Sequence, residues 1–319
     1  MEAFQLLKSL GAQYLNLNFD SQGRYLFRNT EDTWTIAPQP DNILYPETFD
    51  FFVNWRTPVV AAILYVLAVV ALNPKKGKVS RVVAADSAPS SKGKTSSSQE
   101  IAESSPFMTA LVLVHNGILC VYSAWTFYGM FLAWKHSFET QSFKDAVCDK
   151  DGSFWNQLGY YSYYFYLSKY YEIVDTIIIL LKGRRSSLLQ TYHHAGAIIT
   201  MYLGYNFRAH PIWIFTTFNS FVHTIMYAYY AATSIGLKPP GKKYITSMQI
   251  TQFWTGIALA LWYLLASPKG CFENPGSRFA IWSVIVYVLP LIALFLSFAR
   301  QTYGKSKSTN AAAQAKKVK

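Results

Sequence analysis

The sequence is poor in charged residues, histidine and cysteine. Asp, Glu, Lys and Arg make up 14% of the 319 residues, whereas hydrophobic residues make up 51%. Soluble domains have about a quarter of their residues charged, so this composition is unlike theirs. Residues 1–50 also lack the basic start and apolar middle of a signal peptide, so we expect no cleaved leader. The composition indicates a membrane protein.

Apolar runs of about 20 residues recur along the chain, and each is long enough to cross a ~30 Å hydrocarbon core. They predict an all-α polytopic membrane protein with about seven transmembrane helices. The expected spans are 51–72, 107–133, 155–181, 188–204, 212–232, 244–266 and 279–299. We therefore expect an N-terminal segment (1–50), a membrane domain (51–303) with a flexible Ser- and Lys-rich loop (73–106), and a basic tail (304–319).

Basic residues are distributed unevenly over the loops between these spans. One side of the predicted bundle carries 18 Lys and Arg residues and the other carries 9. The positive-inside rule assigns the richer side to the cytosol, which makes the N-terminus lumenal and the C-terminus cytosolic. The net charge of +12 is spread over these loops, so it indicates topology and not nucleic-acid binding.

Two of the three cysteines fall in loops on the predicted lumenal side, where disulfides form. They are Cys148, after the second span, and Cys271, after the sixth. We expect a bridge between them; the alternative is two unpaired thiols.

Polar side chains on five predicted helices lie at a similar depth, roughly 9–15 Å from the cytosolic side at ~1.5 Å per residue. They are His115, Asn116, Glu172, Asp175, His193, His223, Gln249 and Gln252. Buried ionisable groups in a membrane are costly, so we interpret this layer as a functional site. A purely structural hydrogen-bond network is the alternative.

Adjacent histidines, His193 and His194, first suggest a metal site. The chain has only six histidines, and His136 and His210 lie on the lumenal side, which leaves too few for a di-iron site. A single zinc needs about three ligands, and neighbouring histidines diverge by about 100° on a helix. We expect no metal, and a metal-dependent membrane lipid hydrolase is one alternative. A seven-helix lipid or acyl-CoA transporter or receptor is another, although no internal repeat of broken helices is evident.

Neutral imidazole can attack a thioester to form an acyl-imidazole, or can act as a general base. Basic residues at the cytosolic mouth are suited to binding the phosphates of an acyl-CoA, whose acyl tail would run towards the lumenal side. They are Lys182, Arg184, Arg185, Lys242 and Lys243.

Four ordered motifs give the chain a family resemblance. They are "HN" at His115–Asn116, "KYYEIVD" from Lys169, "NSFVHTIMYAYY" from Asn219 and "TSMQITQ" from Thr246. With these motifs the chain resembles the ELO family of fatty-acid elongases over about residues 47–303. Within that family it is most similar in appearance to fungal long-chain elongases. The chain departs from the family's H-x-x-H-H box at its first position, which is Gln190 here. Glutamine hydrogen-bonds but is not a nucleophile.

The resemblance implies condensation of a long-chain acyl-CoA with malonyl-CoA to 3-oxoacyl-CoA, CO2 and CoA in the endoplasmic reticulum membrane. It implies no cofactor, because both CoA esters are substrates. Partners would be the 3-ketoacyl-CoA reductase, dehydratase and enoyl-CoA reductase of the cycle, and a homodimer is compatible with it. Lys316 and Lys317 match a dilysine signal for retrieval to that membrane.

Residue roles follow as expectations. His193 would take the acyl group, and His194 would orient it or move its proton. His223 and Asn219 would bind or decarboxylate the malonyl unit, and Glu172 and Asp175 would position histidines or balance charge. In a direct condensation, His193 or His194 would act only as a base. The expected substrate-binding residues nearby are Lys169, Gln190, Tyr227, Thr246, Gln249, His115 and Asn116.

Overall fold

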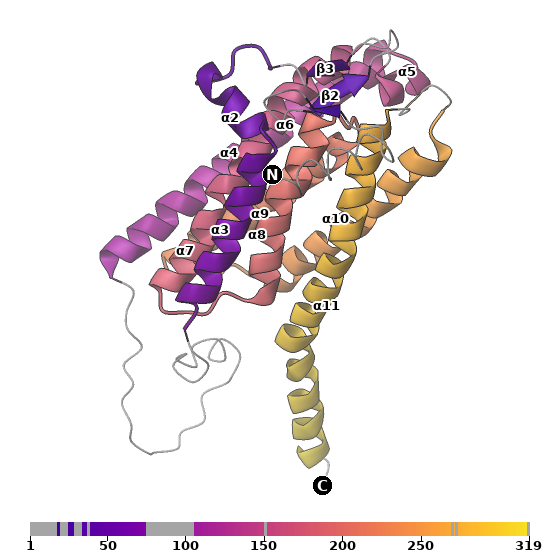
Figure 1. Cartoon of the computed structure of the whole chain (residues 1–319). Coiled ribbons are helices and arrows are strands. Elements are labelled where there is room, and N and C mark those ends of the chain that lie inside the picture. The colour runs from indigo at the N-terminus through magenta and orange to yellow at the C-terminus, as the bar shows by residue number, and fades with distance from the viewer. Residues whose placement is uncertain are drawn as a thin grey trace.

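A computed structural model describes residues 18–19, 25–28, 34–36, 39–74, 105–149, 152–268, 271 and 274–317, with the backbone alone for the strands and for 304–317. The chain folds as a helical bundle (Figure 1). Its helices are η1 (Pro46–Thr48), α2 (Phe49–Val53), α3 (Arg56–Leu72), α4 (Pro106–Thr140), α5 (Phe143–Cys148), α6 (Ser153–Tyr171), α7 (Ile173–Leu181), α8 (Leu188–Asn206), α9 (Ile212–Ser234), α10 (Lys242–Ala266) and α11 (Pro275–Lys317).

All seven apolar segments predicted from the sequence are helical, but three differ in detail. The first is bent by 71° between α2 and α3. The third is divided at Glu172 into α6 and α7, because the Asp175 N–H bonds the Glu172 carbonyl three residues back and tightens the turn. The last, in α11, continues as helical backbone through Lys317, into the expected basic tail (304–319).

A small antiparallel sheet stands outside the all-helical expectation. It pairs β1 (Asn18–Phe19) with β2 (Tyr25–Arg28), and β2 with β3 (Trp34–Ile36). Figure 1 places it near α5, at the end of the bundle opposite the C-terminus. It belongs to the N-terminal segment and not to the membrane domain.

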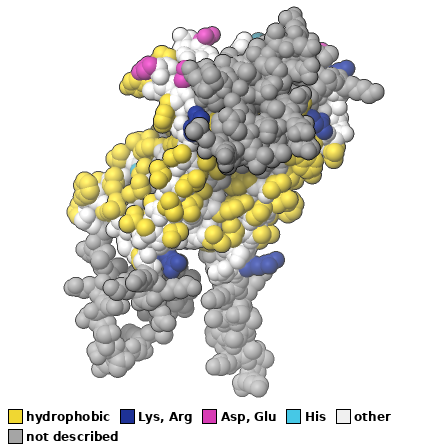
Figure 2. Space-filling view, viewed as in Figure 1, with side chains coloured by type: hydrophobic (Ala, Val, Ile, Leu, Met, Phe, Trp, Pro, Cys, Tyr) yellow, Lys and Arg dark blue, Asp and Glu magenta, His cyan; other side chains and the backbone are white. Residues whose placement is uncertain are grey.

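Within the described residues, two helices, α4 and residues Pro275–Tyr303 of α11, are long and apolar enough to cross a membrane, and the bent α2–α3 pair makes up to three. Large hydrophobic side chains are exposed along α3 and α4, for example Leu67 and Val121. Figure 2 shows a wide hydrophobic band across the middle of the molecule, with Lys and Arg at its lower edge. A belt of this kind is what a bilayer covers. The structure is therefore that of a helical membrane protein.

Helix α8 lies at the centre of the bundle and contacts α3, α6, α7, α9 and α11. Its start is fixed by a serine cap, because the Ser187 hydroxyl accepts a hydrogen bond from the Gln190 N–H. The turn before it contains Gly183 at φ 64°, a conformation that glycine adopts without strain. The short α7–α8 turn thereby brings the "KYYEIVD" helices back against the helix that carries His193 and His194.

Candidate active site

A cavity with about 50 Å³ open to the centre of a water-sized sphere lies among α6, α8, α9, α10 and α11. Its polar lining groups come from all five helices: Lys169, His193, Thr200, Asn219, Gln252 and Tyr287. The remaining lining is apolar, and on α8 it extends from His193 to Met201, about 12 Å further along the helix. The cavity thus joins a polar cluster to an apolar compartment.

His193 lines this cavity, and its ring is held from one side only. Its Nδ1 lies 3.2 Å from the Tyr287 hydroxyl, which also donates to the His193 backbone carbonyl at 2.8 Å. No hydrogen bond joins His193 Nε2 to any side chain among the described residues. This nitrogen is therefore available to a ligand in the cavity.

Lys169 and Asn219 set the orientation of His223. The buried Lys169 ammonium donates to Glu172 Oε1 at 2.6 Å and to Asn219 Oδ1 at 3.3 Å. Because lysine only donates, the Asn219 oxygen faces Lys169 and its amide nitrogen donates to His223 Nε2 at 3.1 Å. His223 then carries its proton on Nδ1, which lies 3.8 Å from Glu172 Oε1.

Gln190 contacts His194, one turn further along α8. Its amide nitrogen donates to His194 Nε2 at 2.8 Å and to Thr176 Oγ1 at 3.4 Å. His194 Nε2 is therefore an acceptor, and the proton lies on Nδ1, which is buried without a hydrogen-bond partner in the described part of the chain. The residue that departs from the family's histidine box thus fixes the protonation of the last histidine in it.

Asp175 joins α4 to α9 at the same level. Its Oδ1 lies 2.9 Å from His115 Nε2, and its Oδ2 accepts from the Tyr227 hydroxyl at 2.8 Å. The Tyr227 ring packs edge-on against the His223 ring at 5.3 Å. Asp175 therefore supports the wall behind His223 and contributes no free group to the cavity.

Three expected binding residues make other contacts. The Asn116 amide donates to the carbonyl of Val112 in its own helix, and Thr246 bonds the Tyr303 hydroxyl. Gln249 donates to the sulfur of Met226. Gln252, by contrast, lines the cavity, and its Oε1 is buried with no hydrogen-bond partner from any residue that the structure describes.

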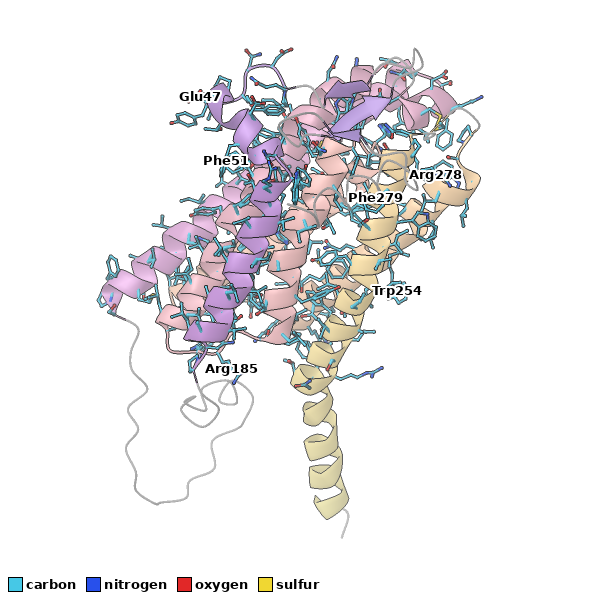
Figure 3. All side chains as sticks on the ribbon, viewed as in Figure 1. Glu47, Phe51, Arg185, Trp254, Arg278 and Phe279 are labelled. Carbon is cyan, nitrogen blue, oxygen red and sulfur yellow. A yellow bond between two sulfur atoms is a disulfide. The ribbon has the colours of Figure 1, made fainter. Side chains whose placement is uncertain are left out.

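The five basic residues expected at the mouth are exposed at one end of the bundle: Lys182, Arg184, Arg185, Lys242 and Lys243. Figure 3 marks this end with Arg185 and the opposite end with Glu47. Partial desolvation and the neighbouring Arg184 guanidinium lower the pKa of Lys182 below its ordinary value. A bound anion would relieve the repulsion between these two cations.

Three atoms that can ligate a metal lie within 4.8 Å of one another, one each from Glu172, His193 and His223. Three is the number of protein ligands that a catalytic zinc uses. The Lys169 ammonium, however, already contacts Glu172 Oε1 at 2.6 Å and brings a positive charge to the same place. This charge disfavours a cation there.

The opposite end of the bundle is closed by a disulfide. The bridge expected between Cys148 and Cys271 is present, and it links the end of α5 to the α10–α11 connection. Asp149, beside it, accepts hydrogen bonds from the Phe154 and Trp155 N–H groups at the start of α6. Burial lowers the pKa of the neighbouring His210 to about 3.

Two polar residues of the cavity lining, Tyr287 and Thr200, were not expected from the sequence. Tyr287 lies in the last apolar segment, where no charged or motif-forming residue marks the helix face that meets the cavity. The available signal was that it is one of few hydrogen-bonding side chains in that segment. Tyrosine is also common in membrane helices near their ends, so this signal is weak.

Comparisons with known proteins agree with the motifs. The ELO: GNS1/SUR4 family model matches residues 51–311. Fatty acid elongase sre1 of Dictyostelium discoideum is 35% identical over 50% of this chain and 60% of its own length. Fatty acid elongase A of the same organism is 30% identical over 61% and 73%. Human very long chain fatty acid elongase 3 is 34% identical over 53% and 62%.

The matched region thus spans between 60% and 73% of these relatives' own lengths. The family match begins four residues and ends eight residues after the corresponding ends of the range that the motifs indicated (47–303). The chain therefore belongs to the ELO (GNS1/SUR4) family, and fatty-acid elongation is the function that the names of its relatives support.

Proposed function

We propose that this protein is a fatty-acid elongase that condenses a long-chain acyl-CoA with malonyl-CoA to give 3-oxoacyl-CoA, CO2 and CoA. One observation carries the proposal: a histidine with an unengaged Nε2 stands where a polar cluster meets an apolar cavity. A thioester carbonyl fits at this boundary, because its acyl tail is apolar and its CoA portion is polar and charged.

The acyl group is transferred to His193, whose Nε2 attacks the thioester carbonyl carbon and displaces CoA. The other two histidines are less suited to attack, since Asn219 occupies His223 Nε2 and Gln190 occupies His194 Nε2. His194 does not line the cavity, but its ring centre lies 5.2 Å from that of His193, so it supports the position of the His193 ring.

Malonyl-CoA then enters beside His223 and Asn219. Loss of CO2 leaves an enolate, whose carbon attacks the acyl carbon while its oxygen is stabilised by nearby donors. The Lys169 ammonium lines the cavity. Its positive charge stabilises the negatively charged malonyl carboxylate and the enolate.

The CoA phosphates bind the basic end that contains Arg184 and Lys243, and the acyl tail runs towards the disulfide. All seven apolar segments then cross the endoplasmic reticulum membrane, with the basic end in the cytosol and the disulfide in the lumen, where oxidation is possible. The product passes to the reductase, dehydratase and enoyl reductase of the cycle, and no redox cofactor is needed for the condensation itself.

Intact-protein mass spectrometry tests the acyl-enzyme. The purified protein is incubated with a long-chain acyl-CoA alone, and then with malonyl-CoA. We expect an acyl adduct that malonyl-CoA discharges with release of CO2, and that is absent from His193→Ala. His136→Ala is the matched control, because His136 is exposed and remote from the cavity.

Two other outcomes separate the alternatives. CO2 release without an adduct would support direct condensation, with His193 as a base. Binding of acyl-CoA with neither adduct nor CO2 would support a transporter and contradict the elongase.

A metal-dependent membrane hydrolase is favoured by one observation, the proximity of ligand atoms on Glu172, His193 and His223. The two proposals differ in their response to chelators. We expect the condensation rate to be unchanged after prolonged treatment with a strong zinc chelator. Loss of activity that is restored by zinc would favour the hydrolase-type site.

A further inference from the structure

Tyr287, on α11, packs against α8 at Tyr192 and Gly196. Tyr192 stacks on it at 5.4 Å with an interplanar angle of 24°, and the Tyr192 hydroxyl donates to the Tyr287 backbone carbonyl. The ring also lies against the backbone at Gly196, where any Cβ would overlap it. The absence of a side chain at position 196 therefore allows the phenol to reach His193.

The hydrogen bonds of Tyr287 determine which nitrogen of His193 carries the proton. A phenol has one proton, and Tyr287 donates it to the His193 carbonyl at 2.8 Å. A carbonyl oxygen accepts and never donates, so this direction is fixed. The Tyr287 oxygen can then only accept from His193 Nδ1, 3.2 Å away, which places the imidazole proton on Nδ1.

We propose that Tyr287 is a positioning residue that holds His193 as the Nδ1–H tautomer and so presents the Nε2 lone pair to the cavity. The proposal deepens the proposed function and rests on it for its catalytic consequence. The tautomer itself is a property of the protein without substrate and can be tested separately.

The tautomer also makes the proton balance of the reaction simple. Attack by Nε2 forms the N–C bond, breaks the C–S bond and gives an acyl-imidazolium and the CoA thiolate. The Nδ1 proton stays in its hydrogen bond to Tyr287. Decarboxylation of malonyl-CoA supplies an enolate, whose carbon takes the acyl group while the N–C electron pair returns to Nε2.

Neutral His193 is thereby regenerated, and the thiolate takes a proton from water. The one proton consumed in the overall condensation is thus taken up by CoA. No proton has to enter or leave the imidazole during the cycle. This is the reason for a fixed tautomer, because a proton on Nε2 would block the attack.

The tautomer is measured by NMR of protein labelled with ¹⁵N-histidine. Protonated and unprotonated ring nitrogens have well-separated shifts, and the chain has six histidines. The His193 signals are those lost in His193→Gln. In the wild type we expect a protonated Nδ1 and an unprotonated Nε2. In Tyr287→Phe we expect both tautomers of His193.

Tyr122→Phe is the matched control. It also removes one hydroxyl that donates to a backbone carbonyl, that of Tyr164, and Tyr122 does not line the cavity. We expect Tyr287→Phe to lower the rate of acyl-enzyme formation about tenfold or more, the effect of losing one hydrogen bond to a reacting group, with little change in KM for acyl-CoA. Tyr122→Phe should keep the wild-type tautomer and rate.

Gly196→Ala is a second test, because the added methyl group displaces the Tyr287 ring from His193 without removing the Tyr287 hydroxyl group. It should resemble Tyr287→Phe in both measurements. A wild-type His193 with its proton on Nε2, or a Tyr287→Phe protein with unchanged tautomer and rate, would overturn the proposal. A wild type with the expected tautomer but no acyl adduct would contradict only the acyl-enzyme function.

Discussion

Removing the Lys169 side chain should destabilise the protein strongly. Its ammonium lies 2.6 Å from Glu172 Oε1, and the two side chains are only 4% and 3% exposed. At an effective dielectric constant of about 20, the attraction across such a distance is roughly 6 kcal/mol, part of which offsets desolvation. For Lys169→Met, which leaves a buried carboxylate unpaired, we expect a loss of about 3–5 kcal/mol in the free energy of unfolding.

Stability and activity should separate in the double variant Lys169→Met/Glu172→Gln. Removing both charges should restore most of the stability, because no unpaired charge is left. The condensation rate should stay about 10²–10⁴-fold below the wild type, the usual contribution of a positioned acid–base group, because Asn219 and His223 lose the contacts that orient them.

Thermal unfolding in detergent micelles and release of labelled CO2 from malonyl-CoA measure the two effects. Lys135→Met is the control, because its pair with Glu139 is more than half exposed on both sides and should contribute little. The reasoning fails if Lys169→Met is as stable as the wild type, or if the double variant is no more stable than the single one.

Three further predictions concern other parts of the chain. Replacing both Cys148 and Cys271 by Ser should lower the free energy of unfolding by about 2–4 kcal/mol, because the bridge spans 123 residues; unchanged thermal unfolding would contradict this. Gln190→Leu should lower the condensation rate about tenfold by freeing His194 Nε2, whereas Gln190→His should retain activity, as product formation by each variant will show. Burial lowers the pKa of His210 from 6.5 to about 3, so between these values the unfolded chain binds a proton that the folded chain does not. The contribution of neutral His210 to the free energy of unfolding should therefore be fully present above pH 6.5 and be lost as the pH falls towards 3. The free energy of unfolding of His210→Gln should decrease less steeply over the same range.

The helices and the polar cluster were predictable because bilayer length and helical spacing leave few choices. Runs of about 20 apolar residues had to be helical, and residues such as Lys169 and Glu172, three apart, had to share a face. The break at Glu172 was not predictable, since it depends on one tightened backbone turn inside an otherwise uniform apolar run.

Contacts between helices were predicted less well. Thr246 and Gln249 follow a regular spacing, and depth along the helix suggested that they reach the histidines. The structure pairs them with Tyr303 and Met226, because the rotation of α10 about its axis is set by packing against α9 and α11. Depth can be counted along a sequence, but rotation depends on the neighbouring helices.

For the three site histidines, the sequence likewise does not show which ring nitrogen carries the proton. Each neutral imidazole has one nitrogen that donates and one that accepts, and its chemistry depends on which one faces the substrate. Lys169 acts on His223 through Asn219, Gln190 acts on His194, and Tyr287 acts on His193 from α11. The motifs mark where the imidazoles lie. Which nitrogen is protonated follows from partners whose other hydrogen bonds leave them a single role, as donor or acceptor, and for His193 that partner lies 94 residues away along the chain.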